Sequence, residues 1–242
     1  MKLVTYHSND PAELIAMDEL LLNKAEAGEI DETLRFWSPE EYFIVVGRAG
    51  RTAEDCFLDR CRRGKIRIIR RISGGGTVLQ GPGCFNYSAI ISYETDGAYR
   101  GVRSSYGKIL GKIRDALKTK RFNAEVFPLS DIALGTRKIS GNAQARKRKF
   151  FLHHGTFLHD FDVGKVSLYL RHPCKEPEYR QNRPHGDFLV NIPIPGEELE
   201  ETLKEVFLVS QPCIWEPGQK DQDDLKDLVC RKFSQDEWNF AF

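Results

Sequence analysis

The sequence has no long apolar stretch. No run of about 18 apolar residues occurs in its 242 residues, and the mean hydropathy is −0.45, so no transmembrane helix is expected. The first ten residues, MKLVTYHSND, contain no apolar core of signal-peptide length. We therefore expect a cytoplasmic protein that does not associate with a membrane.

Cysteine is sparse and unpatterned. The six cysteines form no CxxC pair, and their spacings match no zinc motif. A chain of this length buries roughly 70% of its unfolded surface, so it needs neither a disulfide nor a metal for stability. We expect reduced thiols. Cys84 lies in a glycine-rich segment and is expected to pack in the core rather than to react.

The familiar phosphate-binding motifs are also absent, because there is neither a GxxxxGK[ST] sequence nor a GxGxxG sequence between a strand and a helix. The net charge of +1, from 36 basic and 35 acidic residues, argues against a dedicated nucleic-acid binder. This value averages two unlike parts. Residues 1–196 carry 31 basic and 23 acidic residues, a net of +8, whereas residues 197–242 carry 5 basic and 12 acidic residues, a net of −7.

Apolar periodicity predicts an α+β (α/β) fold with a mixed, largely antiparallel sheet. Helices are expected over 10–27, 106–117, 197–207 and 221–233, with a last turn opened by a capping box at 234–237. Strands are expected over 42–46, 66–71, 77–79, 85–93, 126–134, 150–161 and 186–194. The change to an acidic, helical composition near Pro195 predicts two parts, a catalytic domain over 1–195 and a small helical appendage over 196–242.

The first candidate binding segment is the sequence RRISGGGT. Three consecutive glycines let a backbone approach a ligand closely and direct several N–H groups toward it. Arg70 and Arg71, at the end of a predicted strand, supply bidentate donors suited to phosphate or carboxylate. A flexible surface loop is the competing interpretation, which the arginine pair disfavours.

The second candidate segment, RKISGNAQ, places Lys138 beside small and amide residues. A lysine there can hold a phosphate or carboxylate oxygen and stabilise charge in a transition state. A basic segment that binds nothing is the alternative. The cations that follow at 146–149 have no interleaved aromatic residues for base stacking, so nucleic-acid binding is not favoured.

The third segment, LHHGT, contains His153 and His154. Neighbouring side chains on a strand point to opposite faces and make a poor pair of metal ligands. We expect one histidine to face a site and the other to pack or to face solvent.

The sequences RRISGGGTVLQGPGCFNYS and RKISGNAQARKRKFFLHHGTFL together resemble the lipoate-protein ligase A family, within the biotin/lipoate ligase catalytic fold. The resemblance covers residues 1 to about 195, and within this range the segment from Glu178 to Phe188 is a further, weaker family feature.

The resemblance implies a ligase that uses ATP and Mg²⁺ to convert lipoate to lipoyl-AMP. The enzyme would then transfer the lipoyl group to a lysine of an acceptor lipoyl domain, of the glycine cleavage H or 2-oxoacid dehydrogenase E2 kind. It implies Lys138 as the catalytic residue and a set of substrate-binding residues. These are Arg70, Arg71, Ser73, Gly74, Gly75, Gly76, Thr77, Val78, Leu79, Asn142, His154, Gly155 and Thr156. Monomer is the expected state.

Departures from the family keep alternatives open. Members often have His-Asp where this chain has Gln80-Gly81. Related octanoyltransferases use a cysteine shortly before the lysine motif, where this chain has none at 126–131, so thioester transfer is the second hypothesis. Biotin ligation is a minor one, on a faint likeness at 47–51. The acidic segment after 196 is short for the accessory domain of larger ligases, which points to a reduced version or to an accessory subunit.

Overall fold

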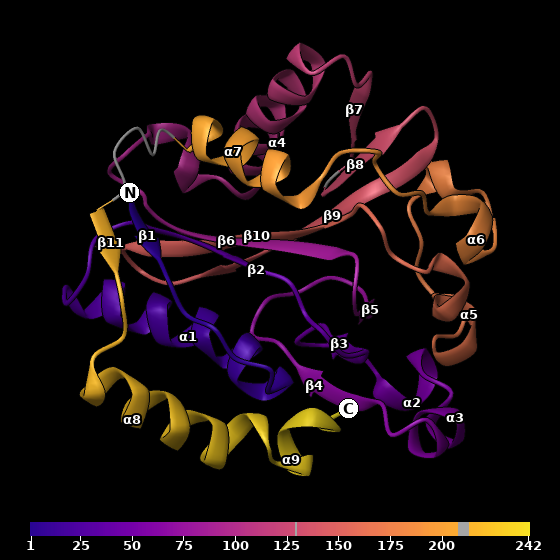
Figure 1. Cartoon of the computed structure of the whole chain (residues 1–242), viewed down its shortest axis with the longest axis horizontal. Helices are drawn as coiled ribbons and strands as arrows, with labels where there is room; N and C mark the ends of the chain where they lie inside the picture. Colours follow the sequence, from indigo (N-terminus) through magenta and orange to yellow (C-terminus); the bar gives the residue numbers. More distant parts are fainter. Residues whose placement is uncertain (129, 208–212) are drawn as a thin grey trace.

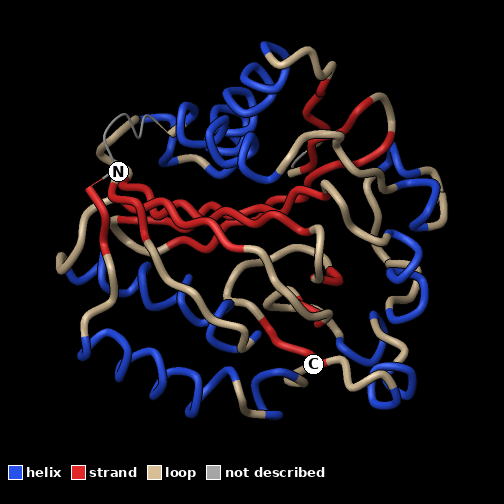
Figure 2. The backbone as a smooth tube through the Cα atoms, viewed as in Figure 1, coloured by secondary structure: helices blue, strands red, loops and turns tan. Residues whose placement is uncertain are grey.

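The computed structural model describes residues 1–128, 130–207 and 213–242, and within them the larger sheet has eight strands in the order β11-β1-β2-β6-β10-β9-β8-β7 (Figures 1 and 2). Its strands are β1 Lys2–Val4, β2 Thr33–Trp37, β6 Cys84–Ser92, β7 Ala124–Phe127, β8 Asp131–Leu134, β9 Arg137–Arg146, β10 Phe150–Leu158 and β11 Cys213–Trp215. β1 runs parallel to β2 and β11, whereas the other neighbouring pairs are antiparallel. The predicted fold class is confirmed.

A smaller sheet lies below the larger one in the view of Figure 1, in the order β4-β3-β5. Its strands are β3 Phe43–Val46, β4 Arg67–Arg70 and β5 Val78–Gln80. β4 pairs only with β3 among the described strands and is therefore an edge strand, and it ends at Arg70, shortly before the three glycines.

Helices cover both faces of the larger sheet (Figure 1). One face carries α4 (Val102–Thr119) and α7 (Gly196–Val206), and the other carries α1 (Pro11–Ala27), with α8 (Gln219–Leu228) and α9 (Asp236–Asn239) outside it. Shorter helices are α2 Thr52–Asp55, α3 Leu58–Arg63, α5 Val166–Tyr169 and α6 His185–Phe188, with η1 Gly97–Arg100, η2 Val163–Lys165, η3 Glu178–Arg180 and the π-helical turn η4 Val229–Phe233. None of the described helices is long and apolar enough to cross a bilayer.

Local sequence explains the start and end of α1. The Asp10 side chain accepts a hydrogen bond from the N–H of Ala12 at 3.0 Å, Pro11 occupies the first turn, and Gly28 ends the helix at φ +80°. The predicted helix is thus confirmed. Glu13, at the position where a capping box would place its acidic residue, accepts instead from the hydroxyls of Tyr6 and Ser8.

The core on the opposite face is built by α4. Ile109, Leu110, Ile113 and Leu117 recur at helical spacing and are all buried against the sheet and α7. Burial of each such side chain contributes about 1.5–3 kcal/mol. These α4 side chains cover the face of β6, β10 and β9 that points away from the smaller sheet.

The segment after residue 196 packs into the same framework. Its helix α7 contributes Leu199 and Leu203 to the α4 core, and β11 extends the sheet beside β1. On the other side, the ammonium of Lys24 in α1 lies 2.6 Å from the carboxylate of Asp221 in α8. The boundary at 195/196 remains a prediction, but the contacts on both faces join the two parts closely.

Four local predictions are corrected. The basic segment from Arg137, predicted to connect two strands, forms β9, which pairs with β10 and β8 in a run of six antiparallel strands from β2 to β7. The expected strand 126–134 belongs to a hairpin of β7 and β8. The apolar run 186–194 forms most of α6 and then extended chain with a single bridge from Leu189 to Lys138, because Pro193, and Pro195 just after the run, interrupt a strand ladder. The last helix is capped by Gln235 without a side-chain hydrogen bond, so no capping box forms at 234–237.

Candidate functional site

Strands β6, β10 and β9 divide the predicted residues between two faces of the larger sheet. Residues directly opposite one another in antiparallel strands share a face, and successive residues alternate. His154 lies opposite Ala143 and Ser88, whereas Gly155 lies opposite Asn142 and Tyr87. The His154 side approaches residues 71–76, which we call the glycine loop, and we call this side the loop face. The Gly155 side faces α4.

The Arg71 side chain is buried within the glycine loop and donates hydrogen bonds to it. Its Nε donates to Ser73 Oγ at 2.9 Å, and one terminal nitrogen donates to the carbonyls of Gly74 at 2.6 Å and Gly76 at 2.9 Å. Gly75 adopts φ +91°, which favours glycine. Burial lowers the pKa of Arg71 to about 10, and no carboxylate among the described residues forms an ion pair with it. The loop therefore presents a buried cation that a phosphate or carboxylate can neutralise.

Arg70 is placed elsewhere, because its side chain points away from the glycine loop. Its guanidinium donates to the carbonyls of Gly47, Gly50 and Trp238 at 2.8–2.9 Å. Its N–H donates to Asn239 Oδ1, and its carbonyl accepts from the Trp238 indole, both at 2.8 Å. The structure thus separates the two adjacent arginines: Arg71 forms the loop, and Arg70 attaches the end of β4 to α9.

The only other cation predicted at the site, Lys138, lies on the loop face beside Gly141. A Cβ at Gly141 would be 2.7 Å from Lys138 Nζ, so the lysine side chain crosses directly over that glycine. Nζ forms an ion pair with Asp131 Oδ1 at 2.8 Å, and the second oxygen of Asp131 accepts from the Tyr179 hydroxyl at 2.8 Å. Burial, with the neighbouring Asp131 carboxylate, raises the pKa of Tyr179. Lys138 is about a quarter exposed and is held at the edge of the site by a buried carboxylate.

His154 lies between α1 and the glycine loop. Its Nε2 is 2.6 Å from Ser73 Oγ, and its Nδ1 is 3.0 Å from the buried carboxylate of Asp18 in α1. Asp18 also forms an ion pair with Arg35 at 3.2 Å. Despite desolvation, hydrogen bonding from His154 and the nearby charges hold the pKa of Asp18 below its usual value, so the carboxylate is ionised.

His153 points to the other face. It is fully buried beneath α4, where its ring nitrogens meet the Tyr87 hydroxyl at 3.1 Å and the Gln144 amide at 3.0 Å. Burial lowers the pKa of His153 to about 3, so the ring is neutral. The predicted division of the two histidines between opposite faces is confirmed.

The remaining predicted residues fall into three groups. Thr156 is on the loop face, but its hydroxyl is taken up by Gln80 at 2.8 Å and Asn86 at 2.5 Å. Thr77 donates to Asp55 at 2.5 Å, while Val78 and Leu79 pack between the two sheets.

Asn142 and Gly155 form the third group, on the α4 side. Asn142 Oδ1 accepts from Tyr87 at 2.7 Å, and its Nδ2 donates to the carbonyl of Ser130 at 2.8 Å. A Cβ at Gly155 would come within 1.9 Å of Asn142 Oδ1. Both residues therefore shape the strands behind the site rather than the loop face itself.

Sequence reasoning missed Asp18, Asp131 and Tyr179. Asp18 had a detectable signal, because it is a carboxylate within the apolar stripe of a predicted helix, and such a residue needs a partner when buried. Asp131 had no such signal, because the pairing of β8 with β9 brings it to Lys138, and Tyr179 reaches the same carboxylate from η3.

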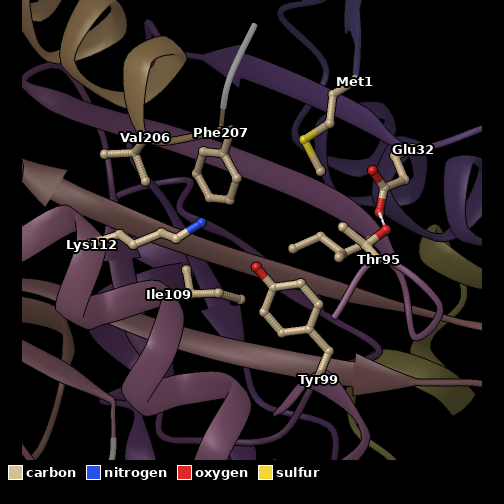
Figure 3. A pocket seen from close by; sticks show the side chains of 9 residues that line it. Met1, Glu32, Thr95, Tyr99, Ile109, Lys112, Val206 and Phe207 are labelled. Carbon is tan, nitrogen blue, oxygen red and sulfur yellow. Dashed lines mark hydrogen bonds between the residues drawn. The ribbon is translucent and has the colours of Figure 1, made fainter. Parts of the chain in front are cut away.

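A separate pocket of about 200 Å³ lies on the α4 side (Figure 3). The Lys112 ammonium and the Tyr99 hydroxyl point into it between apolar side chains, and Glu32 bonds Thr95 at its edge. It contains none of the predicted residues. Among the described residues, no cluster of three or more His, Cys, Asp or Glu side chains could hold a metal ion.

Cys84 stands opposite Leu158 and therefore lies on the same side of β6 as Ser88, but it is fully buried. Cys56, Cys61 and Cys84 are buried in the core around the smaller sheet, and burial raises the pKa of the Cys84 thiol to about 12. Cys174, Cys213 and Cys230 are exposed, the last two in the segment after residue 196.

Comparison with known proteins gives one family and several relatives. Residues 10–193 match the lipoyl protein ligase A/B catalytic domain model. Lipoate–protein ligase 1 of Staphylococcus aureus is 26% identical over all of this chain and 74% of its own length, and octanoyltransferase LipM of Halalkalibacterium halodurans is 25% identical over 96% and 95%.

Among solved structures, a lipoate protein ligase of Thermoplasma acidophilum, described as bi-partite and solved in a study with its E2 lipoyl domain, superposes with a TM-score of 0.83. Its identity is 20%, with coverage of 99% of this chain and 96% of the other. A lipoate-protein ligase A bound with ATP gives a TM-score of 0.80 at 22% identity, over 99% and 98% of the two chains. The family match, which spans the loop face and both motif segments, shows that this chain belongs to the lipoyl protein ligase A/B family.

Proposed function

We propose that this protein is an ATP-dependent lipoate–protein ligase. A lipoate carboxylate oxygen attacks the α-phosphorus of ATP, the bond to pyrophosphate breaks, and lipoyl-AMP forms. A lysine amine of an acceptor lipoyl domain then attacks the acyl carbon, the bond to AMP breaks, and the amide keeps the lipoyl group. The amine loses its proton to water, and AMP leaves as the phosphate anion.

The observation that carries the proposal is the placement of two cations on one face, where the cysteine of β6, Cys84, is buried and offers no exposed thiol. Arg71 supplies a buried guanidinium in the glycine loop, and Lys138 supplies an ammonium held by Asp131. Attack at phosphorus requires orientation and charge stabilisation more than a strong base. We assign Lys138 to the oxygen on which charge develops, and Arg71 with the loop N–H groups to the phosphates.

The second candidate is thioester-dependent octanoyl transfer, which the LipM relatives favour. A cysteine nucleophile needs a reachable thiolate. Cys84, the cysteine within the glycine-rich segment, is fully buried, and its raised pKa of about 12 keeps the thiol protonated at neutral pH. This supports the ligase over the transferase.

Mg²⁺ is proposed to enter with the nucleotide. Magnesium in phosphoryl-transfer sites is held mainly by substrate phosphates, one or two carboxylates and water, so the lack of a three-residue metal cluster among the described residues fits such an ion. When bound, it would neutralise phosphate charge.

The acceptor is proposed to be a lipoyl domain, since the Thermoplasma ligase was studied with its E2 lipoyl domain. That relative is described as bi-partite, which supports a second polypeptide as a partner of this chain.

The test is pyrophosphate release with ATP, Mg²⁺ and lipoate, together with intact-mass detection of the lipoyl group on an apo lipoyl domain. Lys138→Ala should abolish both, whereas Lys149→Ala, an exposed change beyond the same strand, should abolish neither. Supplying preformed lipoyl-AMP tests transfer separately from the activation step, in which we propose that the second polypeptide takes part. Normal turnover by Lys138→Ala, or acyl transfer from a thioester without ATP, would overturn the proposal.

A further inference from the structure

A continuous series of hydrogen bonds joins helix α1 to the glycine loop. It runs from Asp18 Oδ2 to His154 Nδ1 at 3.0 Å, and from His154 Nε2 to Ser73 Oγ at 2.6 Å. It continues from Ser73 Oγ to Arg71 Nε at 2.9 Å, and Arg71 in turn holds the carbonyls of Gly74 and Gly76. We call this series the α1–loop relay.

When the His154 ring is neutral, only one arrangement of protons satisfies the relay. A guanidinium Nε can only donate, so Ser73 Oγ accepts from Arg71 and its single hydrogen goes to His154 Nε2. His154 then carries its own proton on Nδ1, which donates to the ionised carboxylate of Asp18. The tautomer of the neutral His154 ring thus follows from its two neighbours in the relay: Ser73 donates to Nε2 because it accepts from Arg71, and the Asp18 carboxylate accepts from Nδ1. Asp18 and His154 are 136 residues apart in the sequence.

We propose that Asp18 and His154 are positioning residues for the glycine loop, and that protonation of His154 reverses the Ser73 hydroxyl. Protonated His154 donates through Nε2, so Ser73 Oγ accepts from both His154 and Arg71 and turns its hydrogen toward the loop. The loop then gains a donor for an anion bound beside Arg71. This inference rests on the proposed function in taking that anion to be a phosphate of ATP.

The charged groups that surround His154 come from three elements. Asp18 from α1 is a buried carboxylate whose Oδ2 lies 3.0 Å from His154 Nδ1. Arg35 from β2 forms an ion pair with the same carboxylate, and Arg71 from the loop donates to Ser73. Ser88 lies opposite on β6 and is uncharged, and the neighbouring His153 is neutral on the other face.

The experiment compares ATP binding at pH 6 and pH 8 by calorimetry for the unsubstituted protein, His154→Gln and His154→Phe. Glutamine can accept from Ser73 and donate to Asp18 but does not titrate, whereas phenylalanine does neither. His154→Phe should weaken binding about three- to tenfold at both pH values, and His154→Gln should come within about twofold of the unsubstituted protein at pH 8. Because ATP itself titrates in this range, the measured quantity is the affinity ratio of the unsubstituted protein to His154→Gln, which should rise about threefold at pH 6.

His159→Gln, at the residue after β10 and outside the relay, is the matched control and should leave the ratio unchanged. Asp18→Asn is a poor first choice, because it leaves the buried Arg35 without its carboxylate and can prevent folding. The ring nitrogen NMR shifts of His154 test the relay without any ligand, and the Nδ1-protonated tautomer is expected at pH 8.

An Nε2-protonated ring, equal affinities for His154→Phe and the unsubstituted protein, or a pH-independent ratio would overturn the inference. Failure of the protein to bind ATP, with the expected tautomer present, would instead refute the proposed function.

Discussion

The substitution Asn239→Ala tests how α9 supports the glycine loop. Asn239 is buried, with Oδ1 accepting from the Arg70 N–H at 2.8 Å and Nδ2 donating to the Phe233 carbonyl at 2.9 Å. Alanine leaves both backbone groups without these partners. An unsatisfied buried group costs about 1–3 kcal/mol, so the free energy of unfolding should fall by about 2–6 kcal/mol. This is a large part of the roughly 5–15 kcal/mol of a typical domain.

Urea unfolding at neutral pH measures this loss. Asn239→Asp keeps the acceptor for Arg70 and should lose less than alanine, because only the bond to Phe233 disappears. Gln219→Ala, at an exposed site in α8, should change stability by less than about 0.5 kcal/mol. If Asn239→Ala unfolded at the same urea concentration as Gln219→Ala, the assignment of Asn239 and Arg70 as a stabilising pair would be refuted.

Three further predictions concern the strands around the site. Gly141→Ala should lower ligase turnover at least about tenfold with little change in melting temperature, because the new Cβ displaces only the flexible end of the Lys138 side chain. Unchanged turnover would contradict the placement of Lys138 over Gly141. Gly155→Ala should instead cost about 1–3 kcal/mol of stability, because its Cβ would overlap Asn142 and crowd Tyr87. A thermal melt measures this loss, and a melting temperature equal to that of the unsubstituted protein would contradict the prediction. The lowered pKa of His153, about 3 against an ordinary 6.5, means that the unfolded chain binds the extra proton first. The stability contribution of His153 should therefore be complete above pH 6.5 and fall toward pH 3 by up to about 1.4 kcal/mol per pH unit. In His153→Gln this contribution is absent, so its urea midpoint should fall less steeply between pH 6.5 and pH 3 than that of the unsubstituted protein.

Sequence patterns predicted those elements whose signals are local. The Asp10 cap, Pro11 and the apolar stripe mark α1, and the β-branched run marks β3. β9 was hidden because Arg137, Lys138 and the small polar residues after them have low strand propensity, and pairing on both sides overrides that preference. The strand expected at 186–194 failed for the converse reason, since apolar residues there cover the end of the sheet without joining its ladder.

The candidate site shows the same division. The glycine loop and Lys138 were evident from composition and spacing, but the sequence could not tell which of two adjacent arginines forms the loop. That choice follows from the alternation of side chains along β4 and from the arrival of α9 at its free edge. Asp18 and Asp131 reach the site through tertiary contacts, so no motif contains them together with their partners.

The contact between Arg70 and α9 has a consequence for biosynthesis. These groups are 169 residues apart, and a ribosome adding about 5–20 residues per second needs roughly 8–34 seconds to cover that distance. During that interval the N–H and C=O of Arg70 lie at an open strand edge, immediately before the glycine loop. The growing chain can therefore pair its central strands early, but the loop acquires its final support only when residues 238 and 239 have emerged. Binding competence should thus appear late in synthesis, after most of the fold has formed.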